Sequence, residues 1–387
     1  MSSSSQAAPV PSPITSPKPT RSRFPAWLRV VLIVLLVAGS LYYALQDVRW
    51  RDVESAIGRA DPWWILGVAL VVMLAHLARA ERWRDIIPGE PRVGLLNAFS
   101  ATLIGYFMNN LIPRAGEFVR PYTLARRENR STSALLATVA VERILDGLTL
   151  LVILLGILLL IEDDLPRLMN QIDLLKGMEP DDLIVKLGLP IAVLIVGLIL
   201  VIATPLGDRL VGVAERRLPQ KIGGKIRGLF DEFRAGARFS GGILGGARVL
   251  FWSIVIWTGY ALSLHCGVIA FAFDKRYGLN VGDSVVILGI TAIGMAIAPT
   301  PGGFGVFHAF CRATLLTLYG IPANEAVAFA LLTHFAQYMA AMIGGLFFGM
   351  REGLGGLFRS RPGREKGNGR WEKGEEGERR GDKTSKV

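Results

Sequence analysis

Cysteine and histidine are scarce in this chain of 387 residues, which contains two cysteines and four histidines. Cys266 and Cys311 both lie in apolar segments, so we expect them to pack as small hydrophobic side chains rather than form a disulfide framework. No spacing of histidine, cysteine and carboxylate residues is typical of a zinc site. The sequence predicts neither a bound metal nor a cofactor.

Enzymatic signatures are missing as well. The chain has no Gly-x-x-x-x-Gly-Lys-Ser/Thr phosphate loop, no Gly-x-Ser-x-Gly nucleophile elbow and no dinucleotide fingerprint. No stretch outside the apolar segments is long enough and apolar enough to build a soluble core. These absences argue against an ATP-driven pump, unless a partner supplies the motor.

Apolar residues are abundant instead. Hydrophobic residues make up 51% of the chain, and the mean hydropathy is +0.41. Apolar runs approach the length of about 20 residues that crosses a bilayer core, and the clearest are 31–45, 63–77, 148–161, 183–203 and 249–273. We therefore expect an all-α, polytopic integral membrane protein with about seven to nine hydrophobic segments, one or two of them re-entrant or broken.

The charge distribution orients such a protein. The formal net charge is +11, and the basic residues gather in loops and tails, as expected for cytoplasmic flanks rather than for nucleic-acid binding. Arginines precede the first span and follow the second, at Arg21, Arg23, Arg29, Arg79, Arg82, Arg84 and Arg92. The acid-rich stretch 162–182 should face outside. The pattern predicts a multi-pass protein of the plasma or inner membrane with both termini in the cytoplasm.

The two ends of the chain differ in composition from the middle. Residues 1–25 are rich in Ser and Pro, and residues 351–387 mix basic, acidic and Gly residues, so both are predicted to be disordered cytoplasmic tails. Residues 26–350 would form one transmembrane domain. Within it, residues 206–240 are either a basic cytoplasmic loop or a basic amphipathic helix on the anionic inner leaflet.

Two Pro- and Gly-containing stretches interrupt long apolar segments. The first covers residues 109–120 (NNLIPRAGEFVR) and the second covers residues 299–305 (PTPGGFG). Pro removes a backbone donor and Gly adopts unusual backbone angles, so both stretches should break helices. Broken backbone at membrane depth survives only where protein or a water-filled cavity satisfies its polar groups. Two breaks in separate halves of a chain indicate a shared transport site.

The charge pattern also constrains the path of the chain at these breaks. Residues 93–112 should enter and return as a re-entrant hairpin, because a full crossing would place the following arginines outside. Residues 285–298 and 304–318 form either a second hairpin or two full spans. An Ile-Gly pair precedes each break, at Ile104-Gly105 and Ile293-Gly294, which reflects either an inverted repeat or chance similarity.

Charged residues near these segments are candidate substrate-binding residues, because burying them is costly. Arg114, Glu117 and Arg120 are spaced by three and share a face if a helix begins after Pro113. The free N–H groups of that helix start would suit a phosphate, which Arg114 could clamp. Glu117 would hold Arg114 in position or pair with a cationic headgroup.

A second charged group, Glu142, Arg143 and Asp146, begins a long apolar run. Glu142 and Asp146 share a helix face and need a cation between them, which Arg114, Arg120 or a lipid amine could supply. The alternative is a structural ion-pair network that ties the first hairpin to this helix. His308, just after the second break, is expected to be a hydrogen-bonded packing residue rather than a proton carrier.

In order and spacing, these motifs resemble the transmembrane flippase-like domain of lysylphosphatidylglycerol synthases. The resemblance extends from about Trp27 to Met350 and rests on Asn110, Pro113, Arg114, Gly116, Glu117 and Arg120, on Val141-Glu142-Arg143 with Asp146, and on Pro299 to Val306, including Pro301, Gly302, Gly303 and Gly305. It implies paired re-entrant segments and transfer of a phospholipid or polyprenyl-linked lipid between leaflets.

The chain departs from this family's pattern at two points. Full-length synthases add a cytoplasmic aminoacyl-transferase domain, whereas this chain has a polar tail, so we do not expect it to make lysylphosphatidylglycerol itself. Where the family commonly has Glu, this chain has His308, which weakens the expectation of a cationic lipid substrate.

Three functions remain open on this evidence. The first is a lipid flippase, and the second is a membrane-embedded glycosyl- or lipid transferase with Glu142 or Asp146 as its base. The third is a non-catalytic accessory subunit. A homo-oligomer or a separate synthase partner is compatible with each of them.

Overall fold

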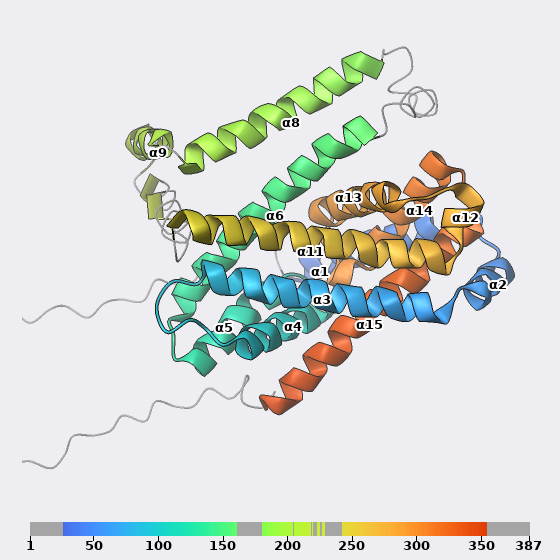
Figure 1. The fold of residues 1–387 in the computed structure, drawn as a ribbon, viewed down its shortest axis with the longest axis horizontal. Helices are drawn as coiled ribbons and strands as arrows, with labels where there is room; N and C mark the ends of the chain where they lie inside the picture. Colours follow the sequence, from blue (N-terminus) through green and yellow to red (C-terminus); the bar gives the residue numbers. More distant parts are fainter. Residues whose placement is uncertain are drawn as a thin grey trace, which may run out of the picture.

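The computed structural model describes residues 26–160, 180–203, 205–217 and 242–353, together with a few single positions between 219 and 228. The described residues form helices and no strands (Figure 1), which confirms the all-α expectation. In chain order the helices are α1 (Ala26–Leu45), α2 (Trp50–Arg59), α3 (Pro62–Ile86), α4 (Leu95–Leu111), α5 (Gly116–Glu128), α6 (Thr132–Leu160), α8 (Pro180–Ala203), α9 (Leu206–Arg217), α11 (Gly242–Ala270), α12 (Phe273–Tyr277), α13 (Val281–Ile297), the 3-10 turn η3 (Pro301–Gly303), α14 (Val306–Tyr319) and α15 (Ala323–Arg351).

Several of these helices have the length and composition of membrane spans. Within the described residues, α3, the Leu244–Ala270 part of α11 and α15 are each long and apolar enough to cross a membrane. Helices α1 and α2 pass this test only as a pair, and the chain bends by 81° between them. Helix α13 and the Gly188–Gly197 part of α8 are shorter apolar helices. The length and composition of these helices are those of a membrane protein. The expected number of about seven to nine hydrophobic segments stays a prediction.

Helices α3 and α11 form the centre of the bundle and pack against each other more extensively than any other described pair. They run in opposite directions, since the N–H of Asp61 at the start of α3 donates to the carbonyl of Ala270 at the end of α11, at 2.9 Å. A Cβ atom on Gly259 would lie 2.9 Å from the Cβ of Ala75, so the two backbones come close because Gly259 has no side chain.

The bundle has two ends. The first carries the loop between α3 and α4, and we call it the basic end. There the C-terminal end of α5 meets the start of α4, where Glu128 accepts a hydrogen bond of 2.7 Å from Asn97. Helix α15 finishes at the same end, where Glu352 pairs with Arg127 at 3.0 Å.

The opposite end carries α2, α12 and the start of α15. Arg276 on α12 pairs with Glu325 on α15 at 2.7 Å, and the backbone N–H of Arg49 donates to Asn324 at 3.0 Å. These contacts join the connection between α1 and α2 to the second half of the chain.

Helices α4 and α5 form a helical hairpin that opens toward the basic end. They pack against each other along their lengths, and a short turn from Ile112 to Ala115 connects them. A Cβ atom on Gly116 would lie 1.9 Å from the carbonyl oxygen of Gly105, so this crossing requires glycine. The predicted break near Pro113 is therefore the tip of a hairpin.

Helices α13 and α14 form a second hairpin, which opens toward the opposite end. Its arms also cross at a glycine, because a Cβ atom on Gly294 would lie 2.5 Å from the ring of Phe310. The tip consists of η3 and its flanking residues, as the Pro/Gly stretch predicted.

The tips of the two hairpins touch. Helix α4 packs against η3, and a Cβ atom on Gly302 would lie 2.9 Å from the side-chain oxygen of Asn110. The two helix breaks, far apart in the sequence, thus meet between the two ends of the bundle.

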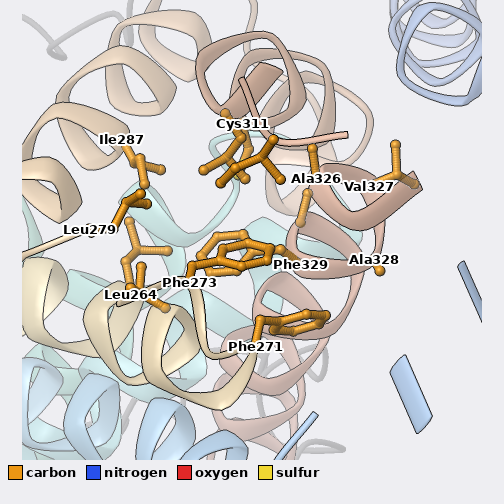
Figure 2. Packing of buried hydrophobic residues seen from close by; sticks show 14 of the residues in the cluster. Leu264, Phe271, Phe273, Leu279, Ile287, Cys311, Ala326, Val327, Ala328 and Phe329 are labelled. Carbon is orange, nitrogen blue, oxygen red and sulfur yellow. The ribbon is translucent and has the colours of Figure 1, made fainter. Parts of the chain in front are cut away.

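A large apolar cluster supports the second hairpin from the opposite end (Figure 2). The rings of Phe273 and Phe329 stack with their centroids 5.6 Å apart, and Phe271 packs on Phe329 at 5.7 Å. Leu264 and Ile287 line the same cluster, which therefore joins α11, α12, α13 and α15. Aromatic pairs of this kind stabilise by about 0.5–1.5 kcal/mol beyond the area they bury.

Other parts of the bundle are more peripheral. Helix α8 packs mainly against α6 and lies on its outer side (Figure 1). Of residues 206–240, predicted as a basic loop or an amphipathic helix, the structure describes α9 and single positions up to residue 228. The N-terminal tail, nearly all of the C-terminal tail and most of the acid-rich stretch 162–182 fall outside the described residues.

The prediction that Arg79, Arg82 and Arg84 follow the second span in a loop was wrong. Arg79, Arg82 and Arg84 lie within α3, which continues to Ile86 because no helix breaker occurs before Pro88. The first two are buried in the bundle, and this placement changes the composition of the candidate site.

Candidate functional site

The first part of the candidate site is the contact between the hairpin tips. The side-chain oxygen of Asn109 accepts a hydrogen bond of 2.7 Å from the N–H of Gly116, which fixes the start of α5. Asn110 is half-buried beside it, next to Gly302. Two neighbouring amide side chains therefore place polar groups where the apolar helix α4 ends.

The second tip depends on three glycines. Gly302, Gly303 and Gly305 have φ angles of 57°, 77° and 81°, in the region that favours glycine. Pro301 begins the turn, and a Cβ atom on Gly302 would also lie 2.8 Å from the ring of Tyr338. The tip is compact because these glycines have no side chains, which lets the backbone approach α4 and α15.

Two buried histidines support this second tip. His334 Nε2 donates to the carbonyl of Gly302 at 3.0 Å, and the N–H of Gly305 donates to His308 Nδ1 at 3.3 Å. The two imidazole rings meet edge to face with centroids 4.8 Å apart. As expected of a packing residue, His308 is buried and hydrogen-bonded.

The second part of the site is a buried charge cluster. It comprises six side chains from three helices: Arg79 and Arg82 on α3, Arg120 on α5, and Glu142, Arg143 and Asp146 on α6. Arg143 is the most exposed of the six, with 48% of its side chain accessible.

Each carboxylate of the cluster contacts at least two guanidinium groups. Asp146 accepts hydrogen bonds from Arg79 Nη1 at 2.8 Å and from Arg82 Nη2 at 2.6 Å. Glu142 lies 2.6 Å from Arg120 Nη2 and 3.6 Å from Arg82 Nη2. Arg82 is thus the cation between the two carboxylates, where Arg114, Arg120 or a lipid amine was expected.

Aromatic side chains surround these charges. The Arg120 guanidinium lies 3.6 Å from the centroid of the Trp83 ring. Arg79 Nε donates to the hydroxyl of Tyr260 at 3.2 Å, and that hydroxyl lies 3.3 Å from the hydroxyl of Tyr106. His76 stacks on Tyr106 at 4.2 Å. Rings therefore bury the cluster on several sides, and the two tyrosine hydroxyls extend its polar network.

The hydrogen bonds of the cluster are incomplete. The Nε atoms of Arg82 and Arg120 are buried without a hydrogen-bond partner, as is Nδ1 of His76. The short contact between Arg120 and Glu142 is also not aligned as a hydrogen bond. Both carboxylate oxygens of Glu142 also lack a hydrogen-bond partner, and buried polar groups without partners are rare.

The two parts of the site share the first hairpin. Tyr106 lies four residues before Asn110 on α4, so the two residues lie on one side of the helix. On α5, Arg120 follows Gly116 by four residues, and a Cβ atom on Gly105 would lie 3.0 Å from the Cβ of Arg120. The hairpin therefore carries polar groups from the tip contact into the charge cluster.

The shared helix face and the free N–H groups expected beside Arg114 do not form. Arg114 lies in the turn before α5, with a φ angle of 63°, so it does not share a helix face with Glu117 and Arg120. The N–H of Gly116 donates to Asn109 and that of Glu117 to the carbonyl of Arg114, at 3.2 Å, so these groups are not free. Among the described residues, no ion pair involves Arg114, which is exposed, or Glu117, which is half-buried.

Sequence reasoning also missed four residues of the cluster region: Arg79, Arg82, Tyr106 and Tyr260. For Arg79 and Arg82 the sequence does contain a usable signal. His76, Arg79 and Arg82 recur every third residue with no Gly or Pro between them. This pattern indicates one face of a continuing helix. Among the described residues, no group of His, Cys, Asp and Glu side chains could hold a metal ion.

Comparison with known proteins places this arrangement in a family. The chain is 24% identical over 345 residues to the glycosyltransferase AglD of Haloferax volcanii, and the match covers 82% of this chain but 54% of that protein, about half its length. It is 22% identical over 326 residues to the UPF0104 membrane protein PH1989 of Pyrococcus horikoshii, covering 77% of this chain and 90% of that protein. The family model for the lysylphosphatidylglycerol synthase TM region matches residues 27–345, and the chain belongs to this family.

Proposed function

We propose that this membrane protein moves a phospholipid or a polyprenyl-linked lipid between the two leaflets. The observation that carries this proposal is the contact between the tips of two hairpins that open toward opposite ends of the bundle. Each hairpin reaches from one end of the bundle to its middle and would provide a path for a polar headgroup. The headgroup would follow this path while the acyl chains stay in lipid.

An inverted repeat accounts for this arrangement. We take α3–α6 and α11–α15 as the two repeats, each with a long helix, a hairpin and a second long helix. Helix α15 packs against α4 of the first hairpin, and α6 packs against α13 of the second. The glycines of the two Ile-Gly pairs, Gly105 and Gly294, lie at equivalent helix crossings. Many transporters place their substrate site at the interface of such repeats.

The basic end would face the cytoplasm, with both hairpins re-entrant. Arginines near this end include Arg84, Arg92, Arg127, Arg130 and Arg248. Cytoplasmic flanks of membrane spans carry an excess of Lys and Arg, which supports this orientation.

A liposome assay tests the function at the hairpin contact. The inner leaflet of proteoliposomes would carry labelled phosphatidylglycerol, phosphatidylethanolamine or polyprenyl phosphate, and a membrane-impermeant quencher outside would report outward movement. We expect the native protein to accelerate movement and Asn110→Ala to slow it about tenfold, the change in rate that follows from about 1.4 kcal/mol.

The matched control for this test is Asn324→Ala. Asn324 is an asparagine on α15 at the opposite end, where it binds Arg49 and Asp52 rather than the hairpin tips. Its transport rate should equal that of the native protein. Equal rates for Asn110→Ala and the native protein would overturn the role of the hairpin contact, and no acceleration of any of these lipids would overturn the proposed function.

The similarity to a glycosyltransferase favours a second candidate, transfer of a group to or from a lipid carrier. The geometry opposes the form in which Glu142 or Asp146 is the base, because guanidinium groups already bind both carboxylates. Turnover of a lipid-linked sugar by the purified protein, lost in Asp146→Asn, would favour this candidate over the flippase.

A further inference from the structure

The buried charge cluster carries more positive than negative charge. Four guanidinium groups, of Arg79, Arg82, Arg120 and Arg143, face two carboxylates, of Glu142 and Asp146, which leaves two positive charges uncompensated. The ion pairs of the described residues bring no third carboxylate to any of these arginines. One unit of this excess lies among the buried guanidinium groups of Arg79, Arg82 and Arg120, and Arg143, which is half-exposed, carries the other.

Such an excess is costly. The side chains of Arg79, Arg82 and Arg120 are 5%, 0% and 7% exposed, so water solvates them little. Removing a charge from water costs several kcal/mol unless an opposite charge replaces the lost hydration. An anion beside the cluster would supply the missing negative charge.

The cluster is accessible on one side. Arg143 is 48% exposed, and Asp146 beside it is 14% exposed. The hydroxyl-bearing side chains of Tyr106 and Tyr260 are half-buried next to Arg79. On this side of the cluster, guanidinium and hydroxyl donors lie together, and such donors bind phosphate oxygens.

The polar side chains around the contact of the two hairpin tips are not carboxylates, while the half-buried Glu117 lies beside the first tip, in the first turn of α5. Asn110, His308, His334 and Tyr338 are uncharged or buried in aromatic contacts there, and none of them is a carboxylate. A cationic headgroup passing the tips would meet no carboxylate among these four side chains, and it would then meet the positive cluster.

We propose that the buried charge cluster binds the phosphate of the transported lipid and thereby selects a headgroup of net negative charge. This inference rests on the proposed function and names the substrate class of the same site. Arg143, Arg79 and the hydroxyls of Tyr106 and Tyr260 receive the phosphate, while Glu142 and Asp146 hold the arginines in position. Two source lipids satisfy this chemistry, an anionic glycerophospholipid and a polyprenyl phosphate.

Binding to the purified protein tests the inference separately from transport. Native mass spectrometry in detergent would compare phosphatidylglycerol, polyprenyl phosphate, zwitterionic phosphatidylethanolamine, cationic lysylphosphatidylglycerol and inorganic phosphate at equal concentration. We expect the two anionic lipids to bind about tenfold more tightly than the zwitterionic and cationic lipids, since like charges in contact are strongly unfavourable. The stronger of the two anionic lipids identifies the source.

Charge reversal at the opening gives the matched variants. In Arg143→Glu the two uncompensated charges become zero, so the preference for anionic lipids should fall to less than about twofold. Arg51→Glu makes the same change on an exposed residue of α2 at the opposite end and should keep the preference. Arg143 is half-exposed, so the variant should still fold, which its elution as a monodisperse species would verify.

The possible outcomes separate the two proposals. Equal or tighter binding of phosphatidylethanolamine or lysylphosphatidylglycerol would overturn the anionic preference, as would an unchanged preference in Arg143→Glu. Inorganic phosphate binding as tightly as the lipids would show a phosphate site that is not a lipid site, which also overturns the inference. Selective lipid binding without any lipid movement in liposomes would support the inference and overturn the flippase.

Discussion

Glu142 is the residue on which the buried charge cluster depends most. Its side chain is 0% exposed and lies between Arg120 on α5 and Arg82 on α3. It therefore joins the first hairpin to the long helices α3 and α6. This is the ion-pair network that the sequence offered as an alternative to substrate binding, with Arg82 as an added member.

Replacing this carboxylate should destabilise the protein strongly. Glu142→Gln leaves the buried guanidinium of Arg120 without its carboxylate and leaves Arg82 with Asp146 alone. Loss of one partner of a buried pair costs about 3–5 kcal/mol. Thermal unfolding in detergent would measure the loss. The double variant Glu142→Gln/Arg120→Gln should recover part of the stability, because it removes the cation that has lost its carboxylate.

Glu81→Gln on α3 provides the comparison. Glu81 pairs with Arg84 and Arg92 near the basic end, where 19% of its side chain is exposed. Surface pairs contribute about 0–1 kcal/mol, so this variant should unfold close to the native temperature. Similar losses in Glu81→Gln and Glu142→Gln would contradict the special place of Glu142.

The sequence predicted Glu142, Arg120 and Asp146 as residues of one site but placed their main partners elsewhere. Positive charge near an apolar segment is a reliable sign of a cytoplasmic loop. Arg79 and Arg82 broke that rule because the carboxylate of Asp146, which lies 67 and 64 residues further along the chain, pairs with both of them inside the bundle. The rule considers only the charges close to a span in the sequence, so it cannot predict an ion pair between residues far apart in the chain.

At the scale of elements, the hairpin of α4 and α5 depends on the contact of two glycines. A Cβ atom on Gly116 would lie 1.9 Å from the carbonyl oxygen of Gly105, a separation that no real side chain tolerates. The arms must move apart if a methyl group is added, and the tip with Asn109 and Asn110 moves with them.

Gly116→Ala should therefore cost about 1–3 kcal/mol, the usual penalty of overpacking, and should slow lipid movement. Gly147→Ala on α6 is the control, since a Cβ atom there meets nothing within 4 Å. Ala favours helices by about 1 kcal/mol over Gly, so the control should raise the unfolding temperature slightly. Two variants with the same melting temperature would show that the hairpin crossing is loose.

The helix breaks were predictable because Pro and Gly act locally on the backbone. Pro113 and Pro301 mark the tips within a few residues of where the structure has them. The start of α5 was not predictable, because the side chain of Asn109 and the left-handed conformation of Arg114 delay it to Gly116. These depend on contacts across the hairpin rather than on neighbouring residues.

At the scale of the whole molecule, the two hairpins open toward opposite ends. Glu90 and Ser131 flank the first hairpin and are exposed, and Val281 and Pro322 flank the second and are also exposed. Cys266 and Cys311 are both buried, and replacing them by Ala leaves no native thiol for background labelling. Single cysteines introduced at the four exposed positions then report the side of the membrane on which each hairpin opens.

If the basic end faces the cytoplasm, as we propose, cysteines at Glu90 and Ser131 should react with a membrane-impermeant maleimide from the cytoplasmic side alone. Cysteines at Val281 and Pro322 should react from the external side alone. Labelling of intact cells and of inverted vesicles measures both. Labelling of Glu90→Cys and Ser131→Cys from different sides would show that α4 and α5 do not return to the side they enter from.

The pairing of α3 with α6 also bears on how the protein is made. Among the described residues, every carboxylate that pairs with Arg79 and Arg82 lies on α6, whereas α11 adds the uncharged hydroxyls of Tyr260 and Ser253. A nascent chain that has reached the end of α6 therefore already holds the ion pairs of these buried arginines. The ribosome can deliver α11 and the helices after it later without leaving those guanidinium groups unpaired in hydrocarbon, so the segment from α3 to α6 is equipped to enter the bilayer on its own.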